Sequence, residues 1–289
     1  MRLSHNVASL QIYQSYSIVQ QNQSIALERI SSGSRINSAK DDPSGIAQSE
    51  RMNMQIKGLQ VAGSNAQDGI SMLQTADGGL GNITDMLQRI RELVVQAGDG
   101  TNTTTGRQSI QNEINQLTSG INDIANDTEF NGKKLLSQSG DSNTQYLEMP
   151  VGANPDEKVQ IPMYNLSLNN SSSASGVNLS DIKSIDITSG GQSVDKTLDV
   201  VDSAISSVSS IRSKYGALEN RFQGTVDNIN DVSNKIQSAD SSLTDADIAK
   251  EMMEYSKDSI LSQAGTAMMV QTNKFPQDVL SILGNVRSR

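Results

Sequence analysis

The sequence is short of the residues that build thick hydrophobic cores and most active sites. Its 289 residues include no cysteine, no tryptophan and a single histidine, with only 3% aromatic and 35% hydrophobic residues. Because a thick core needs large apolar side chains, this composition favours an elongated helical protein with narrow interfaces. Lack of cysteine excludes disulfides and cysteine nucleophiles. One histidine cannot supply both ligands of a His-Glu-x-x-His zinc helix.

Basic charge and long apolar runs are also scarce. The net charge is −9, which offers no attraction to nucleic-acid phosphates. No run reaches the roughly 18 apolar residues of a membrane-spanning helix, and the start lacks the apolar core of a secretory signal. These features alone predict a cytosolic protein. No phosphate-binding loop is present, and His5 is the sole histidine for a Ser-His-Asp arrangement. We therefore predict no enzyme, no cofactor and no metal site.

Apolar residues recur in steps of three and four through much of the chain, a pattern typical of packed helices. The longest such helix is predicted from Pro43, with Asp42 as its N-cap, to about Ala97. Gly78, Gly79 and Gly81 interrupt it, and each costs about 1 kcal/mol relative to alanine. We therefore predict a continuous helix that is softened near Gly78. Its apolar stripe comprises Ile56, Leu59, Gly63, Ala66, Ile70, Leu73, Ala76, Leu80, Ile83, Leu87, Ile90 and Val94.

Further helices are predicted on both sides of a distinct middle region. One stripe covers 110–124 and, after a short turn, should pack antiparallel to the long helix. Another covers 198–236. The N-terminal helix should end near Ile30. The C-terminal helix should start near Asp245 and break near Pro276. The two terminal helices should pair through thin apolar stripes, and methionines 252, 253, 268 and 269 are predicted to be packing filler. The stripes comprise Leu3, Val7, Leu10 and Tyr13 of the first helix, and Ala246, Ala249, Met253, Ile260, Ala264, Met268, Val279 and Leu283 of the last. Because one thin monomer cannot satisfy all of its apolar stripes, the terminal helices above all imply self-association.

The region 140–195 changes character. Apolar residues flank the turn 152–156, which predicts a β-hairpin, and 182–187 alternates weakly. Residues 169–175 are rich in Asn and Ser and are predicted to form an exposed loop. The fold class is therefore mainly α: an elongated antiparallel helical bundle or coiled coil with a small β-hairpin region and paired N- and C-terminal helices.

Six further segments stand out, in order along the chain and at both ends: Ser31–Asn37 with Lys40–Asp42, Asn65–Ser71, Leu87–Gln96, Thr128–Leu136, Asn220–Phe222 and Gln263–Met268. Together these segments resemble bacterial flagellin. The resemblance covers nearly all of the chain outside about 140–195. It implies a short flagellin, the self-assembling structural subunit of the flagellar filament used for motility. The filament is extracellular, and export would proceed without a cleaved signal peptide.

The resemblance also implies a division of the chain and a set of partners. Residues 1–40 and 243–289 would form an inner tube, 41–139 and 196–242 a helical shaft, and 140–195 a surface-exposed insert. The partners would be further copies of the chain, an export chaperone with the type III export apparatus, and the hook–filament junction and cap proteins. The free subunit would also be recognised by host Toll-like receptor and inflammasome sensors.

Two sets of residues carry over from the family by position. The first would contact a Toll-like receptor, neighbouring subunits, or both, and comprises Leu87, Gln88, Arg89, Leu93, Gln96 and Glu113. The second is a terminal segment for assembly and inflammasome sensing, and comprises Val279, Leu280, Ile282 and Leu283. Two alternatives remain open: a hook–filament junction protein built on similar ends, and a non-polymerising helical binding module.

Overall fold

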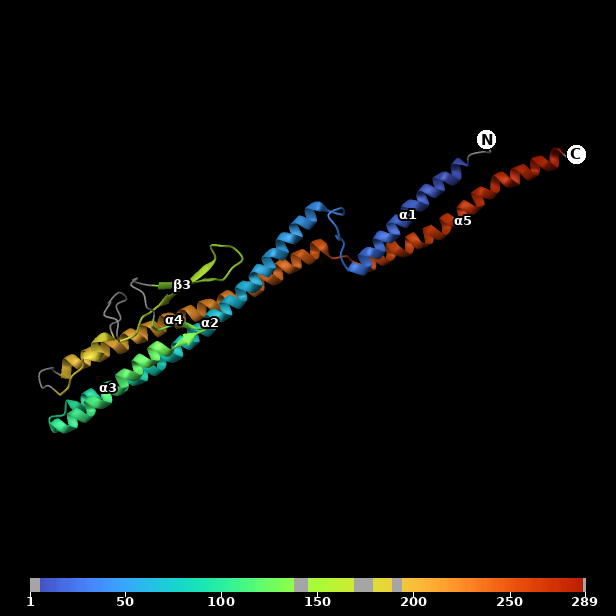
Figure 1. Ribbon diagram of the computed structural model, residues 1–289. Helices are drawn as coiled ribbons and strands as arrows, with labels where there is room; N and C mark the ends of the chain where they lie inside the picture. The colour runs from blue at the N-terminus through green and yellow to red at the C-terminus, as the bar shows by residue number, and fades with distance from the viewer. Residues whose placement is uncertain (1–5, 138–144, 169–178, 189–193, 288–289) are drawn as a thin grey trace. The chain divides into compact units, whose positions relative to one another are not determined.

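The computed structural model describes residues 6–137, 145–168, 179–188 and 194–287 (Figure 1). Residues 1–54 with 235–289 form one compact unit, called the terminal unit below, and residues 55–234 form a second, called the central unit. Both units are mainly helical, as predicted. The predicted three-part division of the chain stays a prediction. Within the described ranges, no helix has both the length and the apolar content needed to cross a membrane.

The terminal unit is built on α1 (Val7–Ser32) and α5 (Ile248–Arg287). The two helices lie side by side and antiparallel, so that their outer ends are neighbours (Figure 1). Helix α1 ends at Gly33, whose φ of 72° places it in the left-handed region that glycine adopts without strain. The pairing of the terminal helices was predicted correctly. The predicted break near Pro276 is wrong, because α5 continues through this proline.

The faces of this helix pair are the reverse of those predicted. The side chains that face the partner helix, here called the α1–α5 interface, are mostly polar or small. They are Ser9, Ile12, Tyr16, Val19, Gln23 and Ala26 of α1, and Glu251, Tyr255, Asp258, Ser262, Gly265, Met269, Thr272 and Val279 of α5. Large apolar side chains point outward instead, with exposed fractions between 42% and 71%. They include Val7, Leu10, Tyr13, Ile18 and Ile25 of α1, and Met252, Met253, Ile260, Met268 and Phe275 of α5. Methionines 252, 253 and 268 are therefore not packing filler within this chain.

The central unit is organised around α2 (Pro43–Ala97), whose first turns belong to the terminal unit. Asp42 Oδ1 accepts hydrogen bonds from the backbone N–H groups of Ser44 and Gly45, which confirms the predicted cap. Helix α3 (Thr104–Asp127) and helix α4 (Val194–Thr244) both run antiparallel to α2. From Ala66 to Val94, every residue of the predicted stripe is buried in the common core. The spacing rule therefore located the buried face of α2 correctly.

The glycine cluster does not interrupt α2. Gly79 faces the core, and a Cβ there would lie 2.7 Å from Thr128 Oγ1 and 3.2 Å from Leu136 Cδ1. Gly78 and Gly81 have open space around the corresponding position. Only one of the three glycines is thus required by packing.

Two hairpins cover the central helices. Strands β1 (Glu129–Phe130) and β2 (Lys133–Lys134) meet at a tight turn in which Asn131 and Gly132 both have positive φ. Phe130 is partly buried and packs against the core, where Leu135 and Leu136 are fully buried. Strands β3 (Gln145–Pro150) and β4 (Lys158–Met163) form the predicted hairpin, with Tyr146 opposite Pro162.

The remaining middle segments are short. The weak alternation at 182–187 is not a strand, because a 3₁₀ helix, η1 (Ser180–Ser184), precedes an extended segment there. Gln111 of α3 donates to Ile185 O and accepts from Ile187 N, which satisfies this backbone by side-chain bonds. The predicted loop at 169–175 lies outside the described residues.

Candidate assembly and recognition surfaces

The predicted recognition face lies on α2 beside α3. Gln88, Arg89 and Gln96 are exposed, and Glu113 reaches the same surface from α3. Leu87 and Leu93 are 0% and 1% exposed, so both belong to the core and support the face from beneath. The first set of carried-over residues is thus divided between surface and interior.

Arg89 organises the exposed part of this face. Its Nη2 and Nε donate to Glu113 Oε1 at 2.9 and 3.2 Å, and its Nη1 donates to Glu92 Oε2 at 3.1 Å. These hydrogen bonds raise the pKa of the Arg89 guanidinium above its ordinary value, and those to Glu113 contribute most. The side chain is half exposed, so the network contributes little to stability. Its effect is to hold one cation and two carboxylates in fixed positions on the surface.

One residue of this face was not predicted. Val95 is 52% exposed and follows Gln88 by one heptad, so the two share a side of α2. The sequence could have indicated Val95, because it is a β-branched apolar residue that lies outside the predicted buried stripe. Val95 places an apolar side chain beside the charges of this face, and protein interfaces combine an apolar centre with a polar rim.

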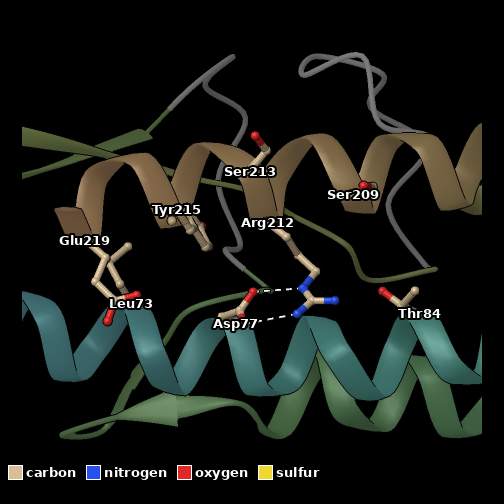
Figure 2. Close-up of a pocket in the computed structure, with 9 residues that line it drawn as sticks. Leu73, Asp77, Thr84, Ser209, Arg212, Ser213, Tyr215 and Glu219 are labelled. Atoms are coloured by element: carbon tan, nitrogen blue, oxygen red, sulfur yellow. Dashed lines mark hydrogen bonds and ion pairs between the residues drawn. The ribbon is translucent and has the colours of Figure 1, made fainter. Parts of the chain in front are cut away.

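A second candidate surface is a groove between α2 and α4, with a volume of about 410 Å³ (Figure 2). Figure 2 shows Arg212 reaching from α4 to Asp77 of α2, where its Nε donates to Oδ1 at 2.8 Å. The hydrogen bond to Asp77 raises the pKa of Arg212. At one end of the groove, Gln74 Nε2 donates to Glu219 Oε1 at 2.6 Å. The charged groups Asp77, Arg212 and Glu219 are therefore all hydrogen-bonded across the two helices, which suits a structural contact better than catalysis.

The terminal segment is only partly described. Val279 is half-buried and Ile282 is exposed, and both lie on α5. The side chains of Leu280 and Leu283 lie outside the description. Ile282 continues the outward-facing apolar side chains of α5, so this segment belongs to the same surface as Met268 and Phe275.

Within the described residues, no group of three or more His, Asp or Glu side chains is placed to hold a metal ion. The buried carboxylate of Glu251 pairs with Arg29 at 3.3 Å, which is a contact between α1 and α5. The described side chains therefore build packing surfaces and ion pairs.

Long antiparallel helices, paired chain ends and apolar side chains turned outward define a helical structural protein. Comparison with known families identifies which one. Residues 3–141 match the bacterial flagellin N-terminal helical region, and residues 198–283 match the bacterial flagellin C-terminal helical region. The chain belongs to the bacterial flagellin family.

Individual relatives agree with this assignment. The chain is 41% identical to flagellin of Bacillus subtilis, over 98% of this chain and all of that protein. It is 38% identical to the flagellar filament 33 kDa core protein of Treponema phagedenis, over 89% and 91% of the two chains. Among solved structures, a putative flagellar hook-associated protein from Vibrio parahaemolyticus shares the fold. That match has a TM-score of 0.59 at 14% identity and covers 71% of this chain and all of the other.

Proposed function

We propose that the chain is the repeating structural subunit of an extracellular flagellar filament. Family membership supports this, as does the similarity to the flagellar filament core protein of Treponema phagedenis. The observation that carries the proposal is the exposed apolar surface of helices α1 and α5. Its apolar side chains point away from the chain's own partner helix, and burying each would contribute about 1.5–3 kcal/mol. Neighbouring copies are the partner that covers such a surface repeatedly.

Seeded growth tests this proposal. Purified subunits added to short filament seeds are expected to extend them into long filaments, seen by electron microscopy. Ile18→Ser should slow elongation at least about tenfold, because Ile18 is 58% exposed and would lose its burial. Tyr146→Ser is the matched control, since Tyr146 is 54% exposed on β3, outside the terminal unit. Equal elongation by both variants would contradict the proposal.

The same assay separates the two alternatives. A hook–filament junction protein would add a short layer to the seed and stop. A non-polymerising binding module would not extend the seed, and its ends would resist protease in the free chain. For a filament subunit we expect protease to trim roughly 30–50 residues from each end of the free chain and to spare them in the polymer.

We further propose that the α2–α3 face serves two partners, a neighbouring subunit and a host Toll-like receptor. The fixed arrangement of Arg89, Glu92 and Glu113 beside Val95 supports a specific protein contact there. Arg89→Asp should lower receptor activation by the free subunit at least about tenfold, as expected when like charges meet in an interface. Arg91→Asp is the control, because Arg91 is equally exposed but pairs with Asp202 of α4. Full signalling by folded Arg89→Asp would refute the receptor contact.

The remaining partners concern the terminal segment and export. We propose that α5, with Ile282 exposed near its end, binds an export chaperone before assembly and an inflammasome sensor in a host cell. Export would use the type III apparatus without a cleaved signal, and growth would involve the junction and cap proteins. Ile282→Asp should weaken chaperone binding by at least about tenfold in calorimetry, whereas exposed Tyr146→Asp should not.

A further inference from the structure

The α1–α5 interface has little to fix its register. In α1 the only fully buried side chain is that of Ala26, and the facing residues of α5 include serine, glycine and threonine. Small and polar side chains interlock weakly, so a slip by one helical turn changes little of the apolar packing. Yet the register of α1 against α5 determines which outward-facing side chains of the two helices lie next to one another on a common surface.

Pro276 creates a special acceptor in this interface. Proline has no N–H group and its ring displaces the carbonyl four residues earlier, so Thr272 O loses its helical donor. This carbonyl nevertheless has a partner. Asn6 Nδ2 donates to Thr272 O at 3.0 Å and also approaches Asn273 Oδ1 at 3.2 Å. The donor comes from the other helix, at the position where the proline has freed an acceptor.

The oxygen of the Asn6 side-chain amide interacts with α1. Its Oδ1 accepts a hydrogen bond from Ser9 N at 3.2 Å and so caps the first turn of the helix. One side chain therefore marks the start of α1 and binds the freed carbonyl of α5. The amide suits both tasks because its oxygen accepts the capping bond while its nitrogen donates to α5.

A second polar contact lies near the opposite end of the pair. Arg29 Nη1 meets Glu251 Oε1 at 3.3 Å, about six helical turns along α1 from Asn6. Both contacts match the same antiparallel register, as does the packing of Tyr16 against Gly265 between them. Buried polar pairs are the best-attested means of fixing register in helical assemblies.

We propose that Asn6 and the carbonyl freed by Pro276 form a clasp that sets the register of α1 against α5. On this account Pro276 is present to release the acceptor, and α5 tolerates it because Asn6 supplies the missing donor. The consequence for assembly, that the clasp aligns the outward apolar side chains into one surface, rests on the proposed function. The clasp itself does not.

A disulfide equilibrium measures the register directly. The chain has no cysteine, so every engineered thiol is unique. A Cβ at position 265 would lie 3.9 Å from Tyr16 Cβ, within the range of native disulfides. Tyr16→Cys with Gly265→Cys therefore reports the observed register. Tyr16→Cys with Met269→Cys reports a slip of one turn. For each pair, the effective concentration is measured against glutathione in full-length free subunits, with no polymer required.

We expect the effective concentration of the observed-register cysteine pair to exceed that of the slipped pair by about tenfold or more. Asn6→Asp keeps the capping oxygen but replaces the donor with an acceptor, and should reduce this ratio about five- to tenfold, the usual effect of one hydrogen bond. Asn22→Asp makes the same change at an exposed site of α1 and should leave the ratio unchanged. With Pro276→Ala, Thr272 O regains a helical donor, so adding Asn6→Asp should then change the ratio less than about twofold.

Two results would overturn the clasp. The first is an equal effect of Asn6→Asp with proline or alanine at position 276, which would mean that the proline plays no part. The second is equal disulfide formation in both registers without any change at Asn6. Neither result bears on seeded filament growth, so failure of the clasp and failure of the proposed function are distinguishable.

Discussion

The three glycines of α2 provide a test in which neighbouring positions should respond in opposite directions. Alanine replaces glycine in a helix with a gain of about 1 kcal/mol, provided that the added methyl group has space. Gly78 and Gly81 have that space, whereas Gly79 does not. Gly78→Ala and Gly81→Ala should each stabilise the chain by about 1 kcal/mol, which corresponds to roughly 2–4 °C in Tm for a domain of this size.

Gly79→Ala should behave differently. Its methyl group would lie 2.7 Å from Thr128 Oγ1, which already donates to Ile124 O at 2.7 Å, and 3.2 Å from Leu136 Cδ1. Overpacking of this kind costs about 1–3 kcal/mol, against a gain of about 1 kcal/mol in helix propensity. The expected net effect is a loss of up to about 2 kcal/mol.

Urea unfolding followed by circular dichroism measures these changes at constant m-value. A background with Thr128→Ala removes both threonine atoms that crowd Gly79, so Gly79→Ala should there become neutral or stabilising. If Gly79→Ala stabilised the chain as much as Gly78→Ala, the close packing of α2 against Thr128 would be refuted.

Two further predictions concern single hydrogen-bonded groups. Tyr215→Phe should destabilise the central unit by about 1–3 kcal/mol in urea unfolding, because Tyr215 is buried and its hydroxyl donates to Pro162 O at 3.1 Å. Burial also raises the pKa of Tyr215, so its phenol should resist ionisation in alkali for as long as the chain stays folded. The pKa of Asp41 is lowered from 3.8 by the backbone N–H of Asn37 and then of Ser38. Its contribution to stability is therefore complete above pH 3.8 and is lost as the pH falls through the lower folded-state pKa. Asp41→Asn should flatten the acid side of the stability curve, and a carboxyl titration by NMR that gave Asp41 an ordinary pKa would contradict this.

Much of the central unit was predictable because its signals are local. The stripe from Ala66 to Val94 is buried within its own chain, so spacing alone located the inward face. The cap at Asp42 and the hairpin around 152–156 follow equally from short-range chemistry. The 3₁₀ helix at Ser180–Ser184 was not predicted because Ile182 is buried in contacts that include α3, which is distant in sequence.

The candidate surfaces likewise combine features that the sequence predicts with features that depend on distant contacts. Family resemblance predicts recognition by the α2–α3 face, which stays a prediction, whereas antiparallel packing places Glu113 beside Arg89 as expected. Spacing could not reveal that Leu93 belongs to the core or that Val95 is exposed, because both lie beside the stripe and neighbouring elements decide their burial. The bond from Asn6 to Thr272 O could not be predicted, because a proline within a helical pattern indicates a helix break and not a freed carbonyl acceptor.

The sequence by itself determined the helical class, the long buried stripe of α2 and membership of the flagellin family, because periodicity and motifs are properties of contiguous residues. Only the tertiary structure decided which faces of the terminal helices meet. Val7, Leu10 and Tyr13 follow helical spacing as faithfully as the buried residues of α2, yet they point outward. Spacing identifies an apolar face without identifying its partner, and in α1 and α5 the chain's own contacts are made mostly by polar and small side chains.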